Sequence, residues 1–264
     1  MSNQQTMDYA DSGSGRPTIA KIGASDLKEA LIKGFKDFDA KPTHFVLLFI
    51  IYPIVGVILI NLTAGHETLP LIFPIVAGFA LIGPFAAVGL YEISRRREQG
   101  LDFSIKYAFA VHRSPSIRAI ITLSIVMMVL YFAWLGAALV IFDLTFGGET
   151  PASFWGFVNE VLTTPAGWAL IVVGSGVGLI FAVVVLALSV VSFPMLLDRD
   201  VSAGMAISTS VRAVAANPVM MAAWGFIVAG LLILGSIPFF FGLAVVMPVL
   251  GHATWHLYRK VVQP

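Results

Sequence analysis

Two histidines one helical turn apart, His252 and His256, are the residues whose type and spacing come closest to a chemical site. An i, i+4 spacing places both imidazoles on one face of a helix, an arrangement that can hold two metal ligands. His44 could approach from an earlier apolar segment as a third ligand. The alternative is an interfacial belt, in which Trp255, His256 and Tyr258 lie at headgroup depth and His252 hydrogen-bonds a neighbouring helix. Two imidazoles without a third convergent ligand favour the belt, so we predict no metal and no redox cofactor at His252, His256 and His44.

The remaining composition excludes most other chemistry. The chain has no cysteine, which rules out disulfides, thiolate metal sites, cysteine nucleophiles and thioether-linked haem. Its five histidines are too few and too near the ends of apolar segments to ligate the two haems and the copper of a catalytic oxidase. Catalytic triads, phosphate-binding glycine loops and nucleotide fingerprints are absent from the sequence. A formal net charge of +1 gives no dominant attraction for nucleic acid, and we expect neither an enzyme nor a nucleic-acid-binding protein.

The elements that must position these residues are apolar helices long enough to cross a membrane. The 264 residues are 58% hydrophobic and only 12% charged, about half the charge of a soluble domain. A bilayer core takes about 20 apolar residues per helix. Runs of that order occur at residues 44–63, 69–91, 116–142 and 166–197, and two more lie within residues 218–258, divided at Gly235, Ser236 and Pro238. The sequence predicts an all-α, polytopic membrane protein with six transmembrane helices.

The basic residues predict how these helices are oriented. The 16 Lys and Arg residues lie before the first run, between the second run and the start of the third at Arg118, between the fourth and fifth, or after the sixth. Short loops rich in Lys and Arg stay on the cytoplasmic side, so both termini are predicted to be cytoplasmic in a bacterial inner membrane. Near the centre of each run there is no ionisable Asp, Glu, Lys or Arg, so a proton-coupled transporter would have no relay.

The pattern also predicts an internal repeat. Pro42, Pro115 and Pro218 each precede an odd-numbered run and follow a segment with amphipathic helical spacing. The unit would be an amphipathic surface helix, a proline and a transmembrane hairpin, repeated over residues 25–92, 101–197 and 201–260 of one 25–260 membrane domain. Residues 1–24 are polar and predicted to be a disordered cytoplasmic tail. Residues 143–165 are predicted to be an external insertion that contains a short helix.

Two groups of residues in these segments have an expected place in the bilayer. Leu27, Leu31, Phe35 and Phe38 form an apolar stripe that we expect to lie on the cytoplasmic membrane surface, and Trp155 should do the same on the outer surface. Gly174 and Gly178 give a small-xxx-small face on which another helix can pack.

Three stretches carry a resemblance to a known family. They are residues 83–96 with Gly83-Pro84-Phe85 and Tyr91-Glu92-Ile93-Ser94-Arg95-Arg96, the run Phe193-Pro194-Met195-Leu196-Leu197-Asp198-Arg199-Asp200, and residues 212–218. Together they resemble a family of bacterial integral membrane proteins of unknown function, some of whose members are labelled cytochrome c oxidase subunit I. The label implies a respiratory setting in the inner membrane of a Gram-negative bacterium. The family supplies no catalytic residues.

Two functions follow as expectations. The first is a non-enzymatic accessory protein that binds, assembles or stabilises another membrane complex, such as a respiratory oxidase. The alternative is a transporter or channel-like carrier for a small or lipid-like ligand, because prolines within the runs could open helices around such a molecule. The expected partners are the lipid bilayer and, for the first function, a respiratory complex; the oligomeric state is left open.

Overall fold

A computed structural model describes residues 17–40, 66–75, 78, 83–84, 87–149, 151–238 and 240–263. The first predicted span, residues 44–63 with His44, lies outside this set, as does most of the predicted tail. In chain order the described elements are β1 (Thr18–Ile19), α1 (Ala24–Ala40), η2 (His66–Leu71), α4 (Val88–Glu98), η3 (Ile105–Tyr107), η4 (Phe109–Arg113), α5 (Ile117–Phe146), α6 (Phe154–Thr163), α7 (Pro165–Ser189), α8 (Ser192–Asp198), α9 (Ala203–Ala216), α10 (Pro218–Ser236), α11 (Leu243–Val261) and β2 (Val262–Gln263).

Three described helices are long and apolar enough to cross a membrane. They are α5 with 30 residues, α7 continued by α8 over the 34 residues Pro165–Asp198, and α10 with 19 residues. They correspond to the third, fourth and fifth predicted runs. The predicted break near Gly235 and Pro238 is present, because α10 ends at Ser236 and α11 begins at Leu243. The chain is therefore an all-α membrane protein, while six spans and the threefold repeat remain predictions.

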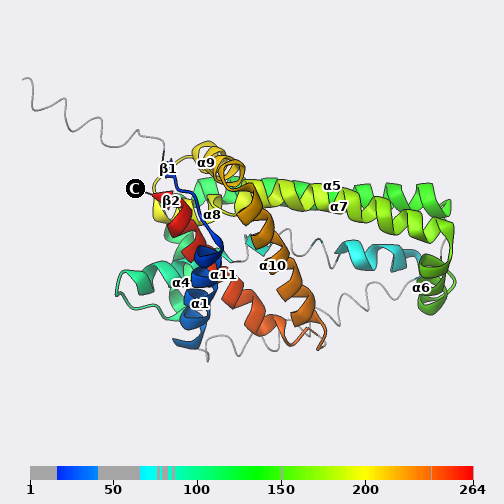
Figure 1. The fold of residues 1–264 in the computed structure, drawn as a ribbon, viewed down its shortest axis with the longest axis horizontal. Coiled ribbons are helices and arrows are strands. Elements are labelled where there is room, and N and C mark those ends of the chain that lie inside the picture. The colour runs from blue at the N-terminus through cyan, green and yellow to red at the C-terminus, as the bar shows by residue number, and fades with distance from the viewer. Residues whose placement is uncertain are drawn as a thin grey trace, which may run out of the picture.

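Two regions of different character make up the described fold (Figure 1). Helices α5 and α7 lie side by side as a long hairpin that projects from the rest, with α6 at its far end. At the opposite end α1, α4, α8, α9 and α11 surround the core, which holds the largest buried side chains, Trp224, Trp255, Tyr91 and Tyr258 among them. Of the most apolar 18-residue window in α7 and α8, only 6% is buried within the chain. The core therefore lies at the base of the hairpin.

Helix α1 packs along α11, the last helix of the chain. Its buried residues Leu27, Ala30, Gly34 and Asp37 recur at helical spacing and form one face. A Cβ atom on Gly34 would lie 2.6 Å from the Ala253 backbone nitrogen, so the two backbones are in direct contact. This close approach requires glycine at residue 34.

The strand pair and a surface clamp hold the same two ends of the chain together. Strands β1 and β2 are antiparallel, with Thr18 opposite Gln263. The Lys260 ammonium lies 3.0 Å from Asp26 Oδ1 and 2.7 Å from Glu29 Oε2. Hydrogen bonds from Lys260, and then from Lys33, lower the pKa of the exposed Glu29 carboxyl to about 2. Residues near the two ends of the sequence thus form one packed unit.

The predicted membrane-surface stripe on α1 is divided by this packing. Leu27 is only 4% exposed and belongs to the core, so its predicted place at the membrane surface is wrong. Leu31 and Phe38 are half-buried, and Leu31 packs against the core. Phe35 is 53% exposed. A face that was expected to meet lipid instead meets α11, and only the side that carries Phe35 is open.

The two other predicted amphipathic segments differ from each other. Helix α9 forms as expected, and the Ser202 hydroxyl caps it by accepting a hydrogen bond from the Met205 backbone N–H. The segment after Asp102 is not an α-helix but the short 3₁₀ turns η3 and η4. The predicted external helix is present as α6, where Trp155 is 78% exposed.

The two packing glycines of α7 also have different surroundings. A Cβ atom on Gly178 would lie 3.1 Å from the Trp134 ring of α5, so Gly178 permits close packing in the hairpin. Among the described residues, a Cβ atom on Gly174 would meet nothing within 4 Å. Gly174 therefore lies on the open face of α7.

Candidate functional site

The Asp37 carboxylate of α1 is a buried polar group with three hydrogen-bond donors around it. Its Oδ2 accepts hydrogen bonds from Ser94 Oγ at 2.6 Å and from His256 Nε2 at 2.8 Å. Its Oδ1 lies 2.5 Å from Arg97 Nη1. Ser94 and Arg97 belong to α4 and His256 to α11, so one buried carboxylate joins three helices.

Hydrogen bonding decides the charge of this carboxylate. Burial is the largest influence on Asp37 and acts to raise its pKa. Hydrogen bonds from His256 and Ser94 act in the opposite direction and together hold the pKa of Asp37 below its ordinary value. Asp37 is therefore ionised at neutral pH, and Arg97 supplies a compensating positive charge 2.5 Å away.

Ser94, His252 and Asp37 are the residue types of a hydrolytic triad, but their connections differ. Nδ1 of His252 lies 2.8 Å from Ser94 Oγ, and the same hydroxyl bonds Asp37. The hydroxyl thus lies between the carboxylate and the imidazole, whereas in a triad the imidazole lies between the other two. Ser94 and His252 are both 0% exposed, which leaves no approach for a substrate. The geometry indicates a structural network.

The two histidines singled out by spacing do come together, but around a carboxylate. His256 contacts Asp37 directly and His252 reaches it through Ser94. Among the described residues no group of three His, Asp or Glu side chains has an arrangement that could hold a metal ion. His44, the third candidate, lies outside those residues. Sequence reasoning missed Asp37 and Ser94; the available signal was an acid at helical spacing on the apolar face of α1.

A second layer of polar contacts joins the end of α11 to α4 and α8. Trp255 Nε1 donates to Glu98 Oε2 at 3.0 Å, and the Tyr258 hydroxyl donates to Asp198 Oδ2 at 2.6 Å. Arg259 bonds both of these carboxylates, each at 3.2 Å. Trp255 and Tyr258 are 1% and 0% exposed, so these two rings pack inside the chain instead of facing the headgroups. They are core residues whose polar atoms are satisfied by acids on neighbouring helices.

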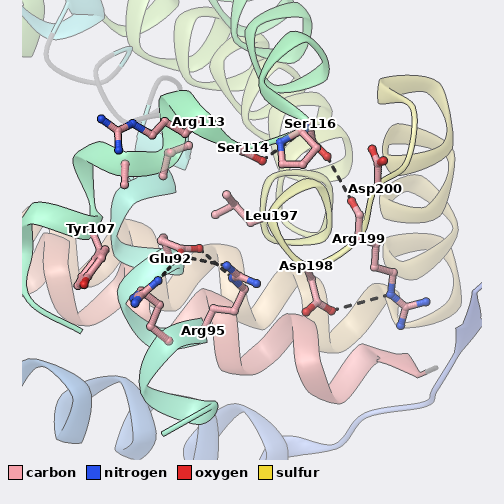
Figure 2. Close-up of a pocket in the computed structure, with 14 residues that line it drawn as sticks. Glu92, Arg95, Tyr107, Arg113, Ser114, Ser116, Leu197, Asp198, Arg199 and Asp200 are labelled. Atoms are coloured by element: carbon pink, nitrogen blue, oxygen red, sulfur yellow. Dashed lines mark hydrogen bonds and ion pairs between the residues drawn. The ribbon is translucent and has the colours of Figure 1, made fainter. Parts of the chain in front are cut away.

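The ends of α4 and α8 line a polar cavity of about 460 Å³ (Figure 2). The cavity lies between α4, η4, the start of α5 and the end of α8. Its lining residues are Glu92, Arg95, Arg96, Tyr107, Ala110, Val111, Arg113, Ser114, Pro115, Ser116, Leu197, Asp198, Arg199 and Asp200. Four guanidinium groups and three carboxylates therefore meet at the end of a membrane-length helix.

Two of the three carboxylates in this cavity are already engaged. Glu92 binds Arg95 through two hydrogen bonds of 2.8 and 3.0 Å. Asp198 accepts from Tyr258 and from Arg259, as described above. Figure 2 shows the Glu92–Arg95 pair on one side of the cavity and Arg113 with Ser114 on the other. The paired acids leave a surplus of positive charge in the lining.

An apolar crevice of about 320 Å³ lies on the other side of α4. Its walls come mainly from α7, α10 and α11, with Leu179, Leu186, Phe226 and Leu250 among the lining side chains. Polar groups are few and include the hydroxyls of Ser189 and Thr254. A crevice of this composition fits an apolar chain better than a polar solute.

Comparison with known proteins agrees with the membrane character of the chain. Residues 72–198, just under half of the chain, match the family model described as "Predicted integral membrane protein (DUF2189)". The matched segment contains most of the cavity lining, from Glu92 to Asp198. No curated protein and no solved structure matches the chain. The resemblance to a membrane family of unknown function is thus confirmed for residues 72–198, while the third resembling stretch, residues 212–218, lies outside the match.

Proposed function

We propose that this chain is a non-enzymatic accessory protein of a bacterial inner membrane, since residues 72–198 match a family model of integral membrane proteins of unknown function. Its role would be to bind, assemble or stabilise another membrane complex. The observation that supports this role is the projecting hairpin of α5 and α7 (Figure 1). Only 6% of the most apolar 18-residue window of its second helix is buried within the chain.

The surface of the hairpin suits contact with another transmembrane helix. Val172 and Ile180 of α7 are 65% and 64% exposed, and Gly174 between them faces open space. Small residues let helix backbones approach closely in lipid, where packing rather than hydrophobicity drives association. The core and the Asp37 network lie at the base of the hairpin, and α5 and α7 extend from there. We take a respiratory oxidase as the first complex to test, since that is the setting which the family resemblance implies.

Non-enzymatic function is supported by the site geometry. Within the described residues, the contact between Ser94, His252 and Asp37 is buried and connected in the wrong order for nucleophilic catalysis. We therefore assign this network a structural role, in which it holds α1, α4 and α11 together.

Co-purification with site-specific crosslinking tests the accessory role. The full chain is solubilised in a mild detergent, with a photocrosslinking amino acid in place of Val172 on α7 or of Ser208 on α9 as the control. We expect subunits of one respiratory complex to be recovered in a fixed ratio and to crosslink from residue 172 but not from residue 208. A chain that purifies alone, with no crosslink from either position, would contradict the proposal.

The second candidate is a carrier for a lipid-like ligand, and the apolar crevice between α7, α10 and α11 favours it. A carrier should purify without partner subunits and retain an apolar ligand that mass spectrometry can identify. The co-purification experiment therefore separates the two functions.

Both termini are proposed to be cytoplasmic, on the evidence that all 16 Lys and Arg residues fall on one side of the predicted spans. The structure supports this in one respect, because β1 and β2 hold the two ends of the described chain together. A reporter fused after Pro264 should be active only in the cytoplasm, and one inserted at Gly148 only in the periplasm. Periplasmic activity of the C-terminal fusion would reverse the proposed orientation.

A further inference from the structure

The polar cavity contains two arginines whose charge the neighbouring acids do not fully neutralise. Arg96 lies over the Tyr107 ring at 3.6 Å and donates from Nε to the Asp102 carbonyl at 2.6 Å. Its Nη1 is 3.8 Å from Glu92, too far for a hydrogen bond, and Glu92 is already held by Arg95. The guanidinium of Arg96 is thus fixed in orientation while its terminal nitrogens keep hydrogen-bonding capacity.

Arg113 has still fewer partners. Its contact within the described residues is a 3.3 Å hydrogen bond from Nε to the His112 ring, and no described carboxylate forms an ion pair with it. It lies with Ser114 across the cavity from the Glu92–Arg95 pair (Figure 2). Two guanidinium groups on different elements, η4 and α4, therefore line one cavity with donors to spare.

Hydroxyl groups add to these donors. Tyr107 and Ser114 line the same cavity as the arginines, whereas the Ser116 hydroxyl in the lining already donates to the Arg199 carbonyl at 3.4 Å. Planar guanidinium groups bind phosphate oxygens bidentately, and hydroxyls supply further donors to the remaining oxygens. This combination fits a tetrahedral oxyanion with several acceptor atoms.

The position of the cavity indicates where such a group would come from. Ser116 immediately precedes α5, and Leu197 and Asp198 end the 34-residue apolar segment that begins at Pro165. The cavity is therefore at the depth where apolar helices leave the hydrocarbon and lipid phosphates are found. Basic pockets at this level bind anionic headgroups.

We propose that this cavity binds a phosphate group through Arg96 and Arg113. The group would be carried by a phospholipid of the adjacent leaflet or by a soluble phosphate ester. Ser114 and Tyr107 would donate to its remaining oxygens. The accessory role proposed above is not needed for this inference, because the binding assay contains no partner protein.

The test measures lipid and phosphate binding to the delipidated full chain in non-ionic detergent. Native mass spectrometry compares a phosphatidylglycerol with a diacylglycerol of the same acyl chains, and calorimetry titrates glycerol 3-phosphate. We expect the wild type to bind the phosphatidylglycerol at least tenfold more tightly than the diacylglycerol. Tight binding of glycerol 3-phosphate without preference for the lipid would assign the phosphate to a soluble ester.

Matched variants connect that binding to the cavity. The pair Arg96→Gln and Arg113→Gln should weaken phosphate binding at least tenfold. The control pair Arg118→Gln and Lys28→Gln removes the same charge from exposed residues outside the cavity, and should change binding less than twofold. If loss of the Arg96 contacts disturbs folding, the single variant Arg113→Gln replaces the pair. It should weaken phosphate binding severalfold. Equal binding of lipid with and without phosphate together with no binding of glycerol 3-phosphate, or equal loss in the cavity and control pairs, would overturn the proposal.

Discussion

Replacing Asp37 by Asn is expected to lower the free energy of unfolding by about 3 kcal/mol, the lower end for removal of one partner from a buried ion pair. The side chain is only 7% exposed and its two oxygens accept from three donors, on Ser94, Arg97 and His256. An amide keeps the shape of the carboxylate but turns one acceptor into a donor, which then faces another donor. The estimate stays at the lower end because the Arg97 side chain is 33% exposed and retains some hydration.

The measurement uses the full chain in detergent, unfolded by increasing amounts of a denaturing detergent and followed by tryptophan fluorescence. Asp39→Asn is the control, since Asp39 lies on the same helix, is exposed, and has no hydrogen bond or ion pair with another described residue. It should change the free energy of unfolding by less than about 0.5 kcal/mol. Because the natural chain has no cysteine, a nitroxide at Lys28→Cys reports separately whether α1 leaves α11. Equal stability of the two Asn variants would contradict the assigned role of Asp37.

The difference in the free energy of unfolding between the wild type and Asp37→Asn should depend on pH, and the sign of this dependence follows from the pKa of Asp37. The pKa of Asp37 is lower in the folded chain than its ordinary value of 3.8, so the unfolded chain binds more protons near that pH. The contribution of Asp37 is therefore fully present above about pH 5 and is lost as the pH falls through 3.8 and then through the folded pKa. The stability difference between wild type and Asp37→Asn should accordingly be largest near neutral pH and narrow in acid. A difference that widens below pH 4 would contradict the ionised state of Asp37.

The sequence predicts those helices that can be recognised from the composition of a single segment. An uncharged run of about 20 residues requires a membrane or a large core, and this is enough to identify α5, α7 and α10. Turn residues between two apolar runs likewise locate the break between Ser236 and Leu243. These features depend on composition within one segment, so no knowledge of distant residues is needed.

The site depended on pairings that a local pattern does not contain. His252 and His256 at i, i+4 could face a metal, the headgroups or another helix, and their spacing is the same in all three cases. In the folded chain both histidines face another helix, because Asp37 on α1 binds one of them directly and the other through Ser94. Asp37 is 219 residues before His256 in the sequence, so no local pattern contains this pairing. The stripe on α1 was misassigned for a related reason, because amphipathic spacing predicts a buried face without saying whether lipid or protein covers it.

Replacing Gly34 by Ala tests the protein cover on that face and is expected to destabilise the chain by about 1–3 kcal/mol, the usual cost of overpacking. The added methyl would lie 2.6 Å from the Ala253 nitrogen and 2.7 Å from the Val249 carbonyl oxygen. Both neighbours are backbone atoms of α11, so neither can rotate away as a side chain would. Relief of the contact requires α1 to move as a whole, which also lengthens the hydrogen bonds that Asp37 accepts from α4 and α11.

The matched control is the same change at Gly174, where the methyl meets no atom of a described residue within 4 Å. Alanine is a better helix former than glycine by about 1 kcal/mol, so Gly174→Ala should leave stability unchanged or raise it slightly. That same preference acts at Gly34 and would make Gly34→Ala stabilising if α1 lay free on a membrane surface, as sequence periodicity alone predicted. Unfolding of both variants under the conditions used for Asp37 therefore distinguishes a helix packed on protein from a helix packed on lipid by the sign of the change at Gly34.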